Sequence, residues 1–63
     1  MRYLIEIESL SGTCYIREYS GGVLWDVVAD AEADITDRPD CRITRVWPID
    51  EAPWEVLSAA ILH

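Results

Sequence analysis

The chain contains no lysine and no phenylalanine, and its single histidine is the last residue, His63. Five arginines against twelve acidic residues give a net charge of −7. A protein that binds nucleic acid or an anionic membrane needs cations to neutralise phosphates, so neither is expected as a direct partner. An acidic protein is instead attracted to basic surfaces.

Cysteine is also scarce, with only Cys14 and Cys41 in 63 residues. Two cysteines cannot form a disulfide framework, and they show neither a CxxC motif nor a spacing that pairs them with histidine. Two buried free thiols are the simplest interpretation. A single bridge between them requires that their strands be neighbours, and the sequence leaves this open.

Long apolar runs are absent. The longest uncharged run near the end, Val56 to Leu62, has seven residues, far fewer than the roughly 20 that span a bilayer. Glu6 and Glu8 interrupt the apolar residues near the start, which excludes a signal peptide there. We therefore expect a cytoplasmic protein, and we interpret the chain, which begins at Met1, as a complete gene product.

Catalytic and metal-binding motifs are missing too. A terminal His63 is poorly placed for catalysis, and the serines have no partner at a recognisable spacing. The series Asp30-x-Glu32-x-Asp34 begins like a calcium-binding EF-hand loop, but its sixth position is Ile35 instead of glycine and its twelfth is Cys41 instead of glutamate. We predict no enzyme, no metal site and no cofactor.

The composition is sufficient for one small folded domain, residues 1–63, because half of the residues are apolar and can form a core. Tyr3, Ile5 and Ile7 fall on one side of the segment 2–8, which predicts a half-buried strand there. The other side carries Arg2, Leu4, Glu6 and Glu8. A turn at 9–12 and a second strand over 13–19 complete an antiparallel hairpin.

Residues 23–35 predict a helix, because Leu24, Val28, Ala31 and Ile35 recur at intervals of four, three and four. The start of this segment, VLWDVV, also suits a strand after a Gly-Gly turn. A loop at 36–40 and a third strand over 41–47 follow. The inner face of that strand is ambiguous, because apolar residues fall on both of its sides.

A second helix is expected after Asp50, which would cap it, with Ile49 and Trp54 forming a hydrophobic staple. Trp54, Leu57 and Ile61 would form its buried stripe. The predicted fold is α+β in the order ββαβα, a three-stranded antiparallel sheet with two helices on one face. We expect the three tryptophans in the core, and an exposed tryptophan would instead indicate an interface anchor.

The densest charge lies in residues 26–40, where six carboxylates accompany a single cation, Arg38. The candidate partner-binding residues are Asp26, Asp30, Glu32, Asp34, Asp37 and Asp40. On a helix, Asp26, Asp30 and Asp34 would stand one turn apart, although like charges at that spacing destabilise a helix by roughly 0.2–0.5 kcal/mol per pair. Folding does not require this row, so it is either a solvated face or a functional one.

The functional hypothesis is that the row imitates phosphates. Asp37 would extend this row into the loop. Duplex DNA carries about one charge per 1.7 Å of axis, whereas the four aspartates from 26 to 37 would carry one per roughly 5 Å if fully helical. A close mimic therefore needs a second row. Candidates for it are Asp40, Asp50, Glu51 and Glu55, or Glu6, Glu8 and Glu18.

A very short, strongly acidic α+β chain without a catalytic motif resembles the small phage-encoded anti-CRISPR proteins of the DNA-mimic type, including those directed at type I-C systems. The resemblance covers the whole chain and consists of size, charge and overall make-up. It implies an inhibitor, acting in the host cytoplasm, that occupies the DNA-binding surface of a CRISPR surveillance complex and blocks target DNA. The alternative is a small acidic regulatory or antitoxin-like subunit that recognises one basic protein by shape.

Overall fold

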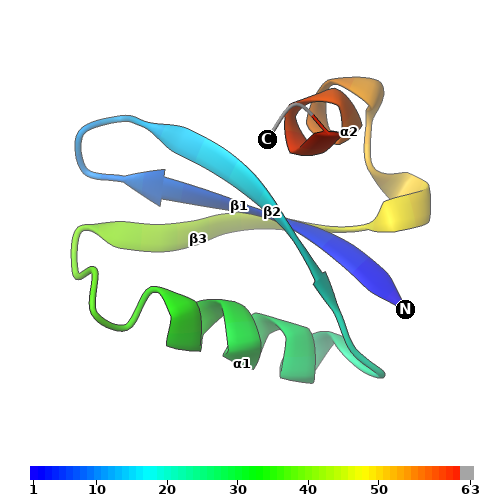
Figure 1. Cartoon of the computed structure of the whole chain (residues 1–63), viewed down its shortest axis with the longest axis horizontal. Helices are drawn as coiled ribbons and strands as arrows, with labels where there is room; N and C mark the ends of the chain where they lie inside the picture. The colour runs from blue at the N-terminus through cyan, green and yellow to red at the C-terminus, as the bar shows by residue number, and fades with distance from the viewer. Residues whose placement is uncertain (62–63) are drawn as a thin grey trace.

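The computed structural model describes residues 1–61 of the chain, except for the side chain of Ile61. Its sheet has three antiparallel strands in the order β2-β1-β3, so β1 is central (Figure 1). The elements in chain order are β1 (Arg2–Ser9), β2 (Cys14–Ser20), α1 (Leu24–Asp34), β3 (Cys41–Pro48), the 3-10 turn η1 (Ile49–Glu51) and α2 (Trp54–Ile61). The predicted α+β class and the order ββαβα are confirmed.

The hairpin of β1 and β2 closes through a tight turn. The Ser9 N–H donates to the Thr13 carbonyl at 2.9 Å, and the Gly12 N–H donates to the Ser9 carbonyl at 3.0 Å. Gly12 has φ +89°, a left-handed conformation that glycine adopts without steric cost. The predicted turn is confirmed, and a glycine at this position makes it possible.

One face of β1 forms the main core against α1. Tyr3, Ile5 and Ile7 are buried there with Val27 and Ala31 of the helix. The predicted alternation of β1 is confirmed, and the predicted helix over 23–35 is confirmed over Leu24–Asp34.

The stripe that α1 buries differs from the predicted one. Val27 and Ala31 are fully buried, whereas Leu24 is 42% exposed and Val28 and Ile35 are half-buried. The helix is therefore rotated slightly from the orientation that its apolar spacing indicated. Val27 gains the central place because it packs closely against the chain at Gly21.

The second helix packs on the opposite face of the sheet. Leu4 is also fully buried, and it points away from the core under α1 because it alternates with Tyr3 and Ile5. Leu57 and Ala60 of α2 lie over it, and Figure 1 shows the sheet between the two helices. The prediction that both helices cover one face is wrong, because β1 is apolar on both faces near its start.

A β-bulge in β3 explains why the inner face of this strand was ambiguous. Glu6 pairs with Arg45, but the next residue, Ile7, pairs with Ile43, so Thr44 is the extra residue. The Thr44 hydroxyl donates to Glu6 Oε1 at 2.6 Å. The bulge brings Ile43 and Val46 to the same face, where both pack against the core under α1.

The start of α2 corrects a further prediction. Asp50 lies in η1 and does not cap the helix; instead, the N–H groups of Val56 and Leu57 donate to the Pro53 carbonyl. Trp54 is 71% exposed, so it belongs neither to a buried stripe nor to a staple. Leu57 is half-buried as expected, and the side chain of Ile61 lies outside the described residues.

The two cysteines are free and lie far apart. Cys14 pairs opposite Glu8 on β2 and Cys41 pairs opposite Ser9 on β3, so they lie on opposite faces of the sheet with β1 between them. Two strand spacings of about 4.8 Å exceed the Cα separation of about 7 Å that a disulfide tolerates. This excludes the bridge in the folded chain, and Cys14 is exposed instead of buried.

Candidate partner-binding surface

Three of the six candidate carboxylates form one row along α1. Because Val27 and Ala31 fix the helix against the sheet, Asp26, Asp30 and Asp34 are left on its flank, one turn apart, and all three are exposed. We call these three residues the acidic row. Its position follows directly from which side of the helix is buried.

Asp34 is the member of the acidic row that contacts the sheet. It accepts a hydrogen bond of 2.8 Å from the Tyr19 hydroxyl, and the Arg17 guanidinium lies 3.9 Å from the same carboxylate. The guanidinium also lies over the Tyr19 ring, 5.9 Å from its centroid. Partial burial, helped by the bond to Asp34, raises the pKa of Tyr19 to about 12.

The other three candidates do not extend the acidic row. Glu32 lies two positions from Asp30 and therefore on another side of the helix. Asp37 and Asp40 lie in the loop after α1, and both are exposed. This loop is tied to the hairpin turn, because the Leu10 N–H donates to the Asp40 carbonyl at 2.8 Å.

The proposed second row does not lie beside the first. Glu6, Glu8 and Glu18 lie on the sheet face opposite α1, where they contact Thr44, Arg42 and Arg2 respectively. Asp50, Glu51 and Glu55 belong to η1 and α2, across the sheet from α1 (Figure 1). These acids therefore do not form a second row next to the acidic row, since the two helices pack on opposite faces.

Two exposed tryptophans were assigned to the core by the sequence analysis. Trp25 is 79% and Trp54 is 71% exposed, whereas Trp47 is half-buried. Both exposed residues lie in the first turn of a helix, in the related segments WDVV and WEVL. Residues two apart on a helix point to nearly opposite sides, so a buried Val27 directs Trp25 outward. In the sequence, both exposed tryptophans are followed directly by an acid, Asp26 and Glu55.

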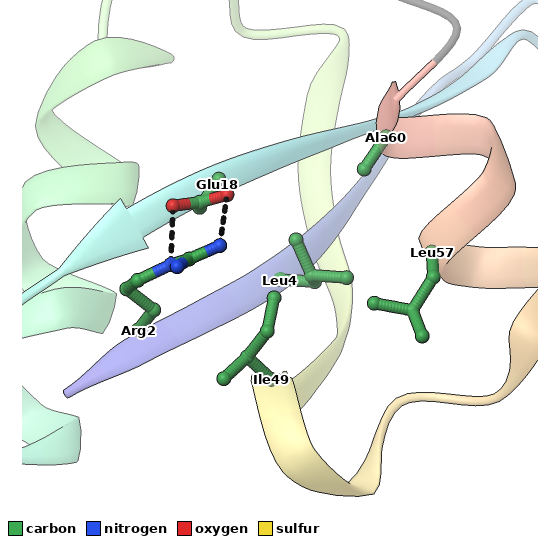
Figure 2. A pocket seen from close by; sticks show the side chains of 6 residues that line it. All are labelled: Arg2, Leu4, Glu18, Ile49, Leu57 and Ala60. Atoms are coloured by element: carbon green, nitrogen blue, oxygen red, sulfur yellow. Dashed lines mark hydrogen bonds and ion pairs between the residues drawn. The ribbon is translucent and has the colours of Figure 1, made fainter.

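A cavity of about 280 Å³ lies between the sheet and α2. Figure 2 shows its lining, Arg2, Leu4, Glu18, Ile49, Leu57 and Ala60. The two charged side chains bond to each other, with Arg2 Nε 2.8 Å from Glu18 Oε2. The other four residues are apolar, so the lining supplies neither a nucleophile nor an unpaired acid or base.

Within the described part of the chain, no group of three or more His, Cys, Asp or Glu side chains is placed to hold a metal ion. The helices of residues 1–61 include none with the length and apolar character needed to cross a membrane. Comparison with protein-family models, with curated proteins and with solved structures finds no match to this chain.

Proposed function

We propose that this protein is an acidic inhibitor that occupies the nucleic-acid-binding surface of a basic protein by DNA mimicry. The observation that carries the proposal is that Asp26 and Asp30 are exposed on a rigid helix and form no ion pair within residues 1–61. Following the resemblance drawn from size and charge, the proposed partner is a CRISPR surveillance complex or a related defence protein. The proposed place of action is the cytoplasm of the host cell.

The spacing of the acidic row supports imitation of one DNA strand. Successive carboxylates one turn apart are separated by about 6 Å along the helix axis. Phosphates of one DNA strand recur about every 3.4 Å of axis, so every second phosphate recurs at about 6.8 Å. Because the other acids lie across the sheet, the mimicry proposed is of a single phosphate track and not of a whole duplex.

The packing of α1 supports the proposal through rigidity. Val27 and Ala31 are fully buried, and the bond from Tyr19 to Asp34 fixes one end of the acidic row. Charges that are already in place lose little conformational entropy on binding, so more of their attraction appears as affinity.

Charge-neutralising variants test the proposal against a matched control. The test variant carries Asp26→Asn and Asp30→Asn, which changes the net charge from −7 to −5 and leaves Asp34 bonded to Tyr19. The control carries Asp50→Asn and Glu51→Gln, with the same net charge of −5 but on the other side of the sheet. The partner is first retrieved from host lysate with the tagged protein, and its binding to duplex DNA is then measured with each variant present.

We expect the test variant to lose most of its inhibition and the control to keep it. Added salt should also weaken the wild-type complex, because exposed charges are screened over about 8–10 Å at physiological ionic strength. Equal inhibition by both variants would show that α1 is not the working surface. A ternary complex with fully bound DNA would exclude occlusion.

The exposed tryptophans favour a second candidate, a small acidic regulatory or antitoxin-like subunit. Tryptophan is enriched among the residues that dominate protein interfaces, and Trp25 and Trp54 lie on elements that cover opposite faces of the sheet. Under this alternative, the retrieved partner is a toxin or a metabolic enzyme. Neutralising Asp26 and Asp30 then leaves binding almost unchanged.

A further inference from the structure

The side of α1 that faces away from the sheet has an unusual composition. Trp25, Ala29 and Ala33 recur every four residues opposite the buried Val27 and Ala31, and all three are exposed. We call these three residues the outer face. A solvated helix face ordinarily carries polar side chains, whereas this one carries a large aromatic residue and two alanines, with the exposed Glu32 and the acidic row next to them.

The exposed apolar surface continues around the start of α1. Val23 and Leu24 are 52% and 42% exposed, and Met1 is 65% exposed. Met1 is held next to this segment by two backbone hydrogen bonds. Its amino group donates to the Gly21 carbonyl, and the Gly21 N–H donates to the Met1 carbonyl. Exposed apolar side chains therefore accompany Trp25 at the start of α1, and a contiguous apolar patch is typical of an interaction site.

The charges beside this apolar surface indicate its occupant. Asp26 and Asp30 have no cationic partner among the described residues, so a segment that covers Trp25 also meets negative charge. Arginine suits both features, since its planar guanidinium stacks on aromatic rings and pairs with carboxylates through two N–H groups. The same combination of an arginine with an aromatic ring and a carboxylate occurs within the chain, where the Arg17 guanidinium lies over the Tyr19 ring and pairs with Asp34.

We infer that the outer face of α1 docks an arginine-bearing segment of a basic protein, with Trp25 as its anchor. One guanidinium stacks on the indole while neighbouring cations pair with Asp26 and Asp30. Ala29 and Ala33 extend no further than Cβ, so the segment lies close to the helix. This inference rests on the proposed function, because it names the chemistry of the partner that the acidic row meets.

The test uses an oligo-arginine peptide and an oligo-lysine peptide of equal length, each titrated into the ¹⁵N-labelled protein. We expect oligo-arginine to bind more tightly and to shift the indole N–H signal of Trp25 while leaving that of Trp54 in place. Trp25→Ala should weaken oligo-arginine binding by about tenfold. Trp54→Ala is the matched control, equally exposed and also followed by an acid, and it should leave binding unchanged.

Two further variants separate stacking from simple apolar contact. Trp25→Phe retains an aromatic ring and should keep the preference for arginine over lysine, whereas Trp25→Leu should abolish it. Equal shifts of both indole signals, or an arginine preference that survives Trp25→Leu, would overturn the inference. Peptide binding is measured without DNA, so the two proposals can fail separately. If the protein does not compete with DNA for its partner but still binds oligo-arginine through Trp25, the proposed function is refuted and this inference is not.

Discussion

At the residue scale, Tyr19 joins the sheet to the acidic row. Its hydroxyl donates to Asp34 from the neighbouring strand β2, and its ring is covered by Arg17. A single side chain thereby contributes both to stability and to the placement of charge on α1. Tyr15, on the same strand, offers a contrast, because its buried hydroxyl has no hydrogen-bond partner among the described residues.

The substitution Tyr19→Phe should lower stability while Tyr15→Phe should not. Loss of the hydrogen bond to Asp34 is expected to cost about 1 kcal/mol, which corresponds to a melting temperature lower by about 4–8 °C in a domain of this size. Thermal unfolding of the two variants at neutral pH measures the difference. If Tyr15→Phe were the more damaging change, the bond between Tyr19 and Asp34 would not stabilise the fold.

The raised pKa of Tyr19 predicts a loss of stability in alkali. The pKa is about 10 in the unfolded chain and about 12 in the folded one, so the neutral hydroxyl is favoured by folding. The stability that the neutral Tyr19 hydroxyl contributes is fully present below pH 10 and is lost as the pH rises to about 12. Denaturant unfolding across this window should show a steeper decline for the wild type than for Tyr19→Phe, and parallel curves would contradict the assignment.

At the scale of elements, the junction between β2 and α1 decides where the helix lies. A Cβ atom built on Gly21 would lie 2.9 Å from Val27 Cγ2, inside van der Waals contact, whereas one on Gly22 would meet nothing within 4 Å. Val27 is fully buried, so it cannot move aside easily. The acidic row and the outer face both depend on this close approach, because it sets the rotation of α1.

Two neighbouring glycines provide a matched test of that junction. Gly21→Ala should destabilise the protein by about 1–3 kcal/mol, as overpacking does in other cores. Gly22→Ala should leave stability unchanged or slightly raised, because alanine restricts the unfolded chain. Chemical denaturation of both variants gives the comparison. Equal stability would show that α1 does not need the close approach at Gly21.

At the scale of the whole molecule, the sheet supports a helix on each face through the alternating residues of β1. Tyr3, Ile5 and Ile7 pack under α1, while Leu4 alone among the buried residues packs under α2. On the side of the sheet that carries α2, Leu4 is therefore the only fully buried side chain among the described residues. The same division separates the acids of α1 from those of η1 and α2.

The substitution Leu4→Ala should be among the most damaging single changes. Truncating a fully buried leucine to alanine costs about 2–5 kcal/mol of stability. This is a large share of the free energy of unfolding of a small domain, which is roughly 5 kcal/mol at the lower end of the usual range. Leu10→Ala, the same change at a side chain that is 87% exposed, should have no measurable effect. The measurement is the midpoint of urea unfolding, and a tolerated Leu4→Ala would mean that α2 is held by other contacts.

Several features could be predicted from the sequence because local patterns determine them. The alternation in β1 and the glycine in the turn specify the hairpin. The helical spacing and the alanines of residues 23–35 specify α1. The exposure of the acidic residues from 26 to 40 also follows from the sequence, because an unpaired buried carboxylate is too costly.

The rest was decided by contacts between residues distant in the sequence. The bulge at Thr44 reversed which side chains of β3 face the core, a change that a period-two pattern cannot show. The close approach at Gly21 turned Trp25 outward. Helix α2 is apolar on most of its sides, so its packing against the sheet around Leu4 determined which face it covers. This packing placed the acids of η1 and α2 across the sheet from the acidic row.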